Sequence, residues 1–437
     1  MGKHALLLAP DVVFTCQGCG DCCRGDWLIG VDAAAHAGLK DVDWARHDPA
    51  LGAGEKFTRL PLPLASGERM TFARGASGAC VFLSAANRCG VHTHLGYGAK
   101  PQVCREFPYQ FVDTPDGIAA GLSFACSAVL HHQGVPLAEQ ATAVADVAAG
   151  SARVAKVPDP IVLYSGVDIS WPHYRPIEDA LLAILGDERV SFPHALLTGS
   201  LLVALCVSLA RLEQRRPEPR ANASTGPGEA KTLAGGLAEL ARDRYRPLID
   251  VALTVTPRAR GSLAYLAPLV TWLEFSRAKG SRFGLVLSLY RNYFQMRRGT
   301  RLPDLLGGGP GSDLAALARV RFADDEPAIA AFLREYWRHV IVRKTLTPMH
   351  GVFRGYHTML TLYALMKWAA RQHALRAGRA ATALEDVRAA VRLVEQRFVL
   401  HAQFARVFEL SPVLTLLADR LYRERGFVPR VVLENHA

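Results

Sequence analysis

The pattern of hydrophobic and polar positions changes character near residue 134. Before this point apolar residues come in short runs broken by glycine and proline, which predicts loops and short strands. The strand candidates are Met70–Phe72, Cys80–Leu83 and Ile118–Cys126. After it, apolar residues recur at the spacing of a helix face. We therefore expect an α+β protein, with a small loop-rich N-terminal domain followed by a mainly α-helical C-terminal region.

Local signals refine the first region. Asp32 is a good N-cap for a helix over Ala33–Ala37, which Gly38 is expected to stop. Asn87–Gly90 has the residues of a hairpin turn. Lys100 and Pro101 open a short helical or turn segment that carries Cys104. These signals predict a domain in which turns hold short elements together.

Helical periodicity dominates the rest of the chain. Helices are expected over Leu137–Lys156, Pro176–Gly186 and Phe192–Arg216, with a strand interruption at Ile161–Trp171. Three further apolar stripes begin at Ile329, Val352 and Leu384. Residues 217–230 have the composition of a flexible linker. The expected parts are thus a cysteine-bearing domain at 1–134, a helical segment at 135–216, the linker at 217–230 and an α-helical domain at 231–437.

Composition narrows the function classes. The chain has 437 residues, 50% of them hydrophobic and 21% charged, so it can bury an ordinary core without disulfides. Its net charge of +11 is not gathered in a basic run interleaved with aromatic residues, so no specific nucleic-acid binding is expected. Ala5–Ala9 is too short for a signal peptide, and Ala195–Ala210 is too short to span a bilayer. We therefore expect a cytoplasmic protein with no membrane span.

Eight of the nine cysteines lie in the N-terminal domain. The first four have the spacing Cys-x2-Cys-x2-Cys-Cys, and the first three of these repeat the spacing of bacterial ferredoxins. Gly18 and Gly20, which lie between them, permit the positive φ that a tight metal-binding turn needs. Because thiols stay reduced in the cytoplasm, we interpret the eight as metal ligands rather than disulfides. They are Cys16, Cys19, Cys22, Cys23, Cys80, Cys89, Cys104 and Cys126.

Sulfur ligands favour zinc or an iron–sulfur cluster, here with [4Fe-4S] as the first choice, over magnesium, calcium or manganese. Eight thiols suffice for two four-ligand sites, or for one site with structural or redox thiols left over. Cys22 and Cys23 would point to opposite sides of an extended segment, so one of them is expected to face a second metal or to be a free thiol. Arg24, Lys100 and Arg105 are close enough in sequence to offset thiolate charge.

Other chemistry-bearing residues are weaker candidates. His92 is a candidate further ligand, and Cys206 lies in the apolar helix, where a buried core residue is expected. No serine-hydrolase, kinase, Rossmann or phosphate-loop motif is present. Catalytic and cofactor-binding residues are therefore not assigned from the sequence.

The cysteine motifs resemble those of a known family. They are Phe14-x-Cys-x-x-Cys-Gly-x-Cys-Cys-Arg24, Cys80-x-Phe-Leu83, Cys89-x-x-His92 and Lys100-Pro-x-x-Cys-Arg-x-Phe-Pro108. Over about residues 12–127 they resemble the YkgJ-type cysteine-cluster family of zinc- or iron-chelating domains. The stretch Gly25–Asp32, the pair Leu95-Gly96 and the long helical C-terminal part are similar to the branch with flagellin lysine-N-methylase.

This resemblance implies a function. It implies that the cysteines hold an iron–sulfur cluster and that S-adenosylmethionine donates methyl groups to lysines of a flagellin-like protein substrate. The alternative is a non-catalytic zinc- or iron-chelating protein whose helical domain binds a protein partner. A third hypothesis is a redox thiol protein.

Overall fold

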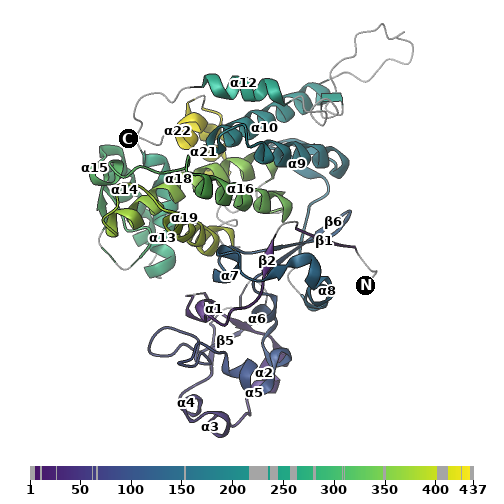
Figure 1. The fold of residues 1–437 in the computed structure, drawn as a ribbon, viewed down its shortest axis with the longest axis vertical. Helices are drawn as coiled ribbons and strands as arrows, with labels where there is room; N and C mark the ends of the chain where they lie inside the picture. The colour runs from purple at the N-terminus through teal and green to yellow at the C-terminus, as the bar shows by residue number, and fades with distance from the viewer. Residues whose placement is uncertain are drawn as a thin grey trace. The chain divides into compact units, whose positions relative to one another are not determined.

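The computed structural model divides into two compact units, residues 1–156 and 157–437 (Figure 1). It describes residues 5–9, 12–25, 27–61, 63–64, 67–151, 154–215, 235–236, 245–255, 263–278, 282–307, 309, 311–347, 351–400, 412–424 and 426–433. The expected linker at 217–230 lies outside these residues, and the finer division at residue 134 stays a prediction. Short strands occur mainly in the first unit and helices dominate the second, so the expected α+β class is confirmed.

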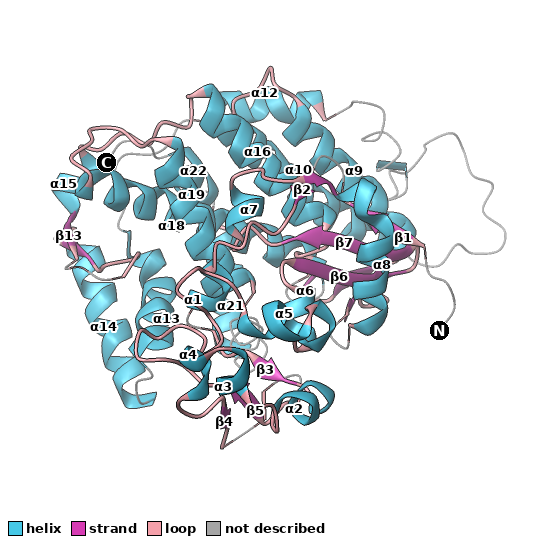
Figure 2. Ribbon diagram, turned by 60° about the horizontal axis from the view of Figure 1, so that its bottom comes forward, coloured by secondary structure: helices cyan, strands magenta, loops and turns pink. Residues whose placement is uncertain are grey.

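Two small sheets and a strand pair organise the first unit. The larger sheet has the order β1-β7-β6-β9, with strands Leu6–Leu8, Gly117–Leu122, Tyr109–Thr114 and Ala155–Lys156. The smaller sheet has the order β3-β5-β4, with strands Gly30–Val31, Met70–Phe72 and Phe57–Arg59. The pair joins β2 (Val13–Phe14) to β8 (Val135–Pro136). In the larger sheet β6 and β7 form an antiparallel hairpin, with β1 parallel to β7 (Figure 2).

Short helices connect these strands. They are α1 (Asp21–Arg24), α2 (Ala33–Leu39), α3 (Trp44–His47), α4 (Pro49–Gly52), α5 (Gly90–Leu95), η1 (Tyr97–Ala99), α6 (Gln102–Glu106), α7 (Ser127–Leu130), η2 (Leu137–Gln140) and α8 (Ala141–Gly150). The predicted cap of α2 is confirmed, because Asp32 Oδ1 accepts a hydrogen bond from the Ala35 N–H at 2.9 Å. Helix α2 nevertheless continues through Gly38 to Leu39, so the predicted stop was wrong.

The strand predictions are partly confirmed. Met70–Phe72 is strand β5, whereas Cys80–Leu83 is a tight turn in which the Leu83 N–H donates to the Cys80 carbonyl at 2.9 Å. Isolated bridges at its two ends, Arg74 to Cys80 and Leu83 to Cys89, replace the expected ladder. The strand expected over Ile118–Cys126 ends at Leu122. The expected helix over Leu137–Lys156 ends at Gly150, and its last two residues form β9 instead.

Helices build the second unit. They are α9 (Trp171–Gly186), α10 (Phe192–Gln214), α12 (Arg246–Thr254), η3 (Leu263–Leu266), α13 (Ala267–Ala278), α14 (Arg282–Arg298), α15 (Leu314–Ala318), α16 (Pro327–Val342), α18 (Val352–Arg376), α19 (Leu384–Val394), the π-helical turn η4 (Glu395–Val399), α21 (Pro412–Tyr422) and α22 (Phe427–Leu433). Its strands form two hairpins: β10 (Ile161–Tyr164) with β11 (Val167–Ile169), and β12 (Arg301–Leu302) with β13 (Ser312–Asp313). The three apolar stripes are confirmed as the buried faces of α16, α18 and α19.

Helix α10 is the apolar helix that the sequence predicts to be buried. Among the described residues it is the one helix long and apolar enough to cross a membrane by length and composition. However, 67% of its most apolar window is buried inside the structure, as expected of a core helix. Cys206 lies on this helix and is 0% exposed, which confirms its prediction as a core residue.

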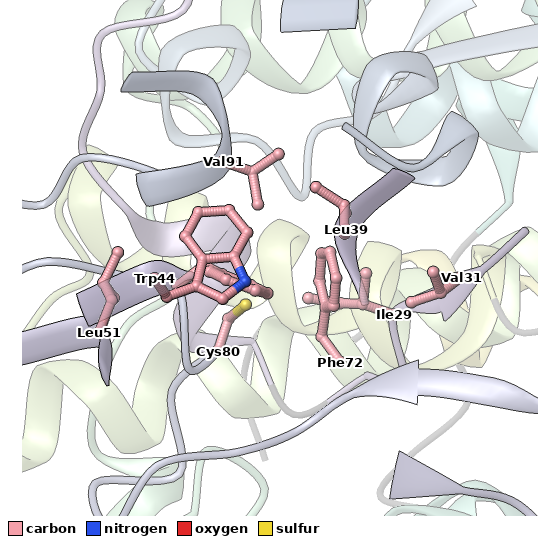
Figure 3. Packing of buried hydrophobic residues seen from close by; sticks show 9 residues of the cluster. Ile29, Val31, Leu39, Trp44, Leu51, Phe72, Cys80 and Val91 are labelled. Atoms are coloured by element: carbon pink, nitrogen blue, oxygen red, sulfur yellow. The ribbon is translucent and has the colours of Figure 1, made fainter. Parts of the chain in front are cut away.

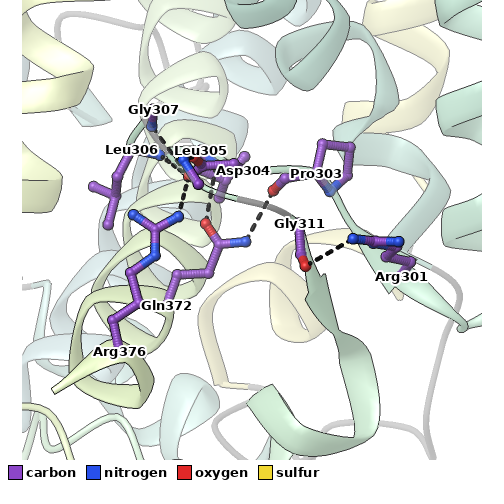
Figure 4. Close-up of polar contacts among 10 residues, drawn as sticks. Arg301, Pro303, Asp304, Leu305, Leu306, Gly307, Gly311, Gln372 and Arg376 are labelled. Atoms are coloured by element: carbon purple, nitrogen blue, oxygen red, sulfur yellow. Dashed lines mark hydrogen bonds and ion pairs between the residues drawn. The ribbon is translucent and has the colours of Figure 1, made fainter.

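The glycine-rich loop that follows β12 is held by α18 (Figure 4). Asp304 Oδ1 accepts hydrogen bonds from the N–H groups of Leu306 and Gly307 at 3.0 Å, and it pairs with Arg376 of α18 at 2.5 Å. Gln372, one turn earlier on α18, accepts from the Leu305 N–H at 3.0 Å. This loop is thus tied to α18 through a backbone N–H group and through the Asp304 carboxylate.

Candidate metal centre

Helix α1 carries Cys22 and Cys23, the adjacent pair of the cysteine motif. Gly18 and Gly20 precede it with φ values of 63° and 73°, so the expected positive φ is confirmed. At Gly20 a Cβ would also come within 3.0 Å of a Leu83 methyl group. The sequence-based picture of an extended Cys22–Cys23 segment was wrong, because both lie in a helical turn with their sulfurs 3.9 Å apart.

Four cysteines lie at the apolar core of the first unit, and we call them the inner group: Cys23, Cys80, Cys89 and Cys104. Cys80 is 5% exposed and belongs to a buried cluster with Ile29, Val31, Leu39, Trp44, Leu51, Phe72, Phe82 and Val91 (Figure 3). The other three members of the group pack against this cluster. The Cys80 N–H donates to the Cys23 carbonyl at 2.8 Å, which joins the turn at residue 80 to helix α1.

The other four cysteines form what we call the outer group: Cys16, Cys19, Cys22 and Cys126. Cys16 is exposed and follows strand β2, while Cys126 is the N-cap of α7. Helix α7 packs against β2, and the Thr15 N–H donates to the Gln133 carbonyl at 3.0 Å. This packing brings Cys126, which is more than a hundred residues away in sequence, to the start of the cysteine motif.

Electrostatic interactions connect the thiols of the inner group. Burial raises the pKa of Cys80 to about 11, and the nearby Cys89 thiolate raises it as well. Burial also raises the pKa of Cys104, which is further raised by Cys80 and Cys89 and lowered by Lys100. Buried thiols that lie close together resist ionisation, because their negative charges would repel one another, unless a cation is bound beside them. A bound metal ion provides this positive charge and stabilises the thiolate form of its ligands.

The outer group shows the same coupling. Burial raises the pKa of Cys126 to about 11, and the Cys22 and Cys19 thiolates raise it further. Burial also raises the pKa of Cys19, and the neighbouring Cys22 and Cys16 thiolates raise it further. The hydrogen bond between the Cys22 and Cys23 sulfurs, in which either sulfur can be the donor, lowers the pKa of one thiol of the pair and raises that of the other.

All nine cysteines, each of which lies in a described part of the chain, are free thiols. Within the described ranges, no three His, Cys, Asp or Glu side chains converge closely enough to hold one metal ion. A tetrahedral zinc site with Zn–S bonds of about 2.3 Å requires its sulfurs to lie about 3.8 Å apart. The Cys22–Cys23 separation of 3.9 Å is of this size, but it involves only two ligands.

Basic residues surround the thiols, and one of them was missed in the sequence. The Arg74 guanidinium donates to the Cys23 carbonyl at 3.0 Å and to the Trp27 carbonyl, and its charge opposes the rise in the pKa of Cys80 that burial causes. Lys100, one of the basic residues predicted from the sequence, likewise lowers the pKa of Cys104. Arg74 stands six positions before Cys80, but its role depends on the bridge that pairs these two residues.

The remaining predicted basic residues and histidine have other surroundings. Arg24 donates to the Cys19 carbonyl at 2.8 Å and to Asn87, so it braces the loop that carries the motif. Arg105 lies near Asp32, whose pKa it helps to lower. His92 is exposed on α5, and its ring lies edge-to-face with Tyr97 at 5.7 Å. The structure therefore does not bring His92 into a ligand set among the described residues.

Comparison with known families identifies the cysteine region. Residues 15–124 match the family model CxxCxxCC, described as "Putative zinc- or iron-chelating domain". The match includes every predicted ligand except Cys126, and it confirms the cysteine-cluster interpretation. The likeness to flagellin lysine-N-methylase stays a prediction. No curated protein and no solved structure matches the chain.

Proposed function

We propose that the first unit binds metal through its cysteine cluster, in the form of a [4Fe-4S] cluster. One observation carries this choice over zinc. Cys16, Cys19 and Cys22 have the Cys-x2-Cys-x2-Cys spacing with which bacterial ferredoxins present three thiolates to one cluster.

The surroundings of the thiols support the same assignment. Cys80 and its neighbours lie in an apolar cluster, where uncompensated thiolates are costly. A bound cluster would compensate their charge, with Arg74 and Lys100 offsetting the remaining negative charge. Because metal binding is coupled to folding, the first unit should depend on its metal for stability.

Anaerobic purification followed by metal analysis tests this proposal. A brown protein with stoichiometric iron and acid-labile sulfide is expected. A colourless protein that retains zinc would refute the iron–sulfur assignment and leave the zinc-chelating alternative. The matched control is Cys206→Ala, which lies in the second unit and should retain the wild-type metal content.

We further propose that the chain is an S-adenosylmethionine-dependent protein lysine N-methyltransferase with a flagellin-like substrate. The motif likeness of Gly25–Asp32 and Leu95-Gly96 to flagellin lysine-N-methylase supports this proposal. Calorimetric titration of the metal-loaded protein with S-adenosylmethionine should give saturable binding, and methyl groups should transfer to flagellin lysines. Failure of both, with the metal centre intact, would refute the methyltransferase and leave metal binding standing.

A non-catalytic role, in which the second unit binds a protein partner, is the second candidate. Helix α14 supports this role, because the helix buries a polar side chain and exposes large apolar ones. Asn292 is 0% exposed and donates to Thr271 and Glu274, whereas five large apolar side chains are between 37% and 60% exposed. These are Val286, Leu287, Tyr290, Tyr293 and Phe294. The helix contains arginines but no Lys, Asp or Glu, which is the composition of a protein-interface core.

Charge substitutions on this face test the partner role. Tyr290→Glu with Phe294→Glu should weaken the binding of purified flagellin at least tenfold, because a charge would be buried against the partner. Leu416→Glu, on α21, is the matched control, since Leu416 is 66% exposed. Equal binding by all three proteins would refute a role for α14. Binding of flagellin without any methyl transfer would favour the non-catalytic role over the enzyme.

A further inference from the structure

The second unit contains an open cavity of about 390 Å³ beside the glycine-rich loop that follows β12. Small-molecule sites in proteins typically have volumes of about 300 to 1,000 Å³. The polar side chains on its walls are Glu274 of α13, Arg291 and Gln295 of α14, Arg301 of β12 and Asp304 of the loop. The cavity is therefore large enough for a small molecule and is lined by charged groups of both signs.

Both carboxylates on the cavity wall are already bound by protein donors. Glu274 accepts two hydrogen bonds from Arg291, at 2.8 and 2.9 Å. Asp304 accepts from the Gly309 N–H at 2.7 Å and pairs with Arg376 at 2.5 Å. Burial alone would raise the pKa of Asp304, but these two donors hold it below its usual value. Neither carboxylate is therefore left to attract a cation.

Arg301 is the positive charge on the cavity wall that lacks such a partner. Its side chain is exposed and, within the described ranges, makes one hydrogen bond, to the Gly311 carbonyl at 3.2 Å, and no ion pair (Figure 4). Asp313 lies opposite Arg301 in the β12–β13 hairpin, but its carboxylate accepts from the Ala316 N–H at 2.9 Å and caps α15. Because a guanidinium has five N–H donors, most of those of Arg301 stay available to a ligand.

Arg291 adds a second guanidinium to the same cavity. Its hydrogen bonds to Glu274 and Ser288 are all made by one terminal nitrogen, Nη2. The other N–H groups of this guanidinium have no partner among the described residues. Guanidinium groups typically pair with both oxygens of a carboxylate or phosphate at once. Two guanidiniums with unused donors in one cavity therefore favour an oxyanion as the ligand.

The glycines of the loop form the wall of the cavity with their backbone. Gly309 and Gly311 both line it. A Cβ at Gly311 would lie 2.6 Å from the Leu302 carbonyl oxygen, and one at Gly309 would come within 3.0 Å of the Arg376 guanidinium. The crowding excludes side chains at these two positions, so a ligand can approach the backbone closely.

We propose that this cavity binds a small molecule through a carboxylate or phosphate group, which Arg301 and Arg291 hold. The binding group itself fills only part of the cavity, and the rest of the molecule occupies the remainder. All the residues involved lie in the second unit, so this site is independent of the cysteine cluster and of the function proposed for it.

Calorimetric titration of the full chain with inorganic phosphate and, separately, with succinate tests the site. We expect saturable binding of at least one probe, and the tighter of the two identifies the group that is recognised. Arg301→Gln should weaken this binding at least tenfold, because hydrogen bonds to a charged group are lost. Arg301→Lys should weaken it less, since lysine keeps the charge but not the planar fork.

Arg298→Gln is the matched control for these variants. Arg298 is exposed on α14 but does not line the cavity, so the variant should bind the probe as the wild type does. An equal loss of binding in Arg298→Gln and Arg301→Gln would overturn the proposal, because it would reduce the effect to overall charge. The absence of saturable binding of both probes to the wild-type chain would also overturn it.

Chemical modification of the unsubstituted protein covers the case in which a variant fails to fold. Phenylglyoxal reacts with accessible guanidinium groups, and peptide mass spectrometry measures the rate at each arginine. The bound probe should slow the modification of Arg301 and leave that of Arg298 unchanged. An unchanged rate at Arg301 in the presence of a saturating probe would overturn the proposal.

Discussion

Asp32 joins the helix that follows the cysteine motif to the helix that carries Cys104. One carboxylate oxygen accepts from the Ala35 N–H at 2.9 Å and caps α2, and the other accepts from the Gln102 N–H at 2.9 Å, at the start of α6. Loss of an N-cap costs about 1 kcal/mol, and loss of a hydrogen bond to a charged group costs about 1.5 kcal/mol at the lower end of its range. Asp32→Ala should therefore destabilise the first unit by about 2.5 kcal/mol.

Asp48 provides the matched control for this substitution. It also caps a helix, since its carboxylate accepts from the Ala50 N–H at 2.9 Å, but this bond is exposed and lies within a single turn of the chain. Asp48→Ala should cost about 1 kcal/mol. Urea unfolding followed by tryptophan fluorescence, compared with the wild-type protein, measures both values. Equal losses for the two variants would refute a stabilising role for the Asp32–Gln102 bond.

The pH dependence of Asp32 gives an independent check. Burial alone would raise its pKa, but hydrogen bonds from Ala35 and Gln102 hold the pKa below its usual value. A carboxylate with a depressed pKa in the folded state stabilises the protein fully above its unfolded pKa of about 3.9. This contribution is lost as the pH falls through the lower folded-state pKa. The stability difference between wild type and Asp32→Ala should therefore shrink in acid.

Three other predictions concern the metal and the second unit. Cys19→Ala should lose metal, measured by elemental analysis, and the S-adenosylmethionine binding that depends on it; unchanged metal would contradict its assignment as a ligand. Glu395→Gln should destabilise the second unit by about 3–5 kcal/mol in urea unfolding, because it leaves Arg343 buried without its charged partner. The two side chains pair at 2.5 Å, and that of Arg343 is 0% exposed. Glu385→Gln, at an exposed position, is the control, and equal losses of stability in the two variants would refute the argument. Burial lowers the pKa of His357 to about 4, so the free energy of unfolding should fall by about 3 kcal/mol as the pH drops from about 6.5 to 4. His357→Gln should remove this pH dependence, and a variant whose stability depends on pH as the wild type's does would contradict the prediction.

Local residue patterns were enough to predict several elements. The cap at Asp32 and the positive φ at Gly18 and Gly20 depend on interactions within a few residues, so the sequence already contains their causes. The apolar stripes that begin at Ile329 and Val352 were also predictable from local sequence, because apolar residues at helical spacing form one face that packs against the core. The prediction failed where a contact with a distant segment decides the conformation, as in the turn at Cys80–Leu83, which bridges to Arg74 and Cys89.

The number, spacing and chemistry of the thiols were determined by the sequence alone. Eight cysteines with ferredoxin-like spacing at their start predict a metal-binding domain without any knowledge of the fold. The tertiary structure decided which thiols are neighbours. Cys126 reaches the start of the motif because α7 packs on β2, and Cys23 turns towards Cys80 because α1 is helical rather than extended. Spacing along the chain specifies only the ligands within one turn, whereas the grouping of distant thiols depends on how the sheets and helices pack.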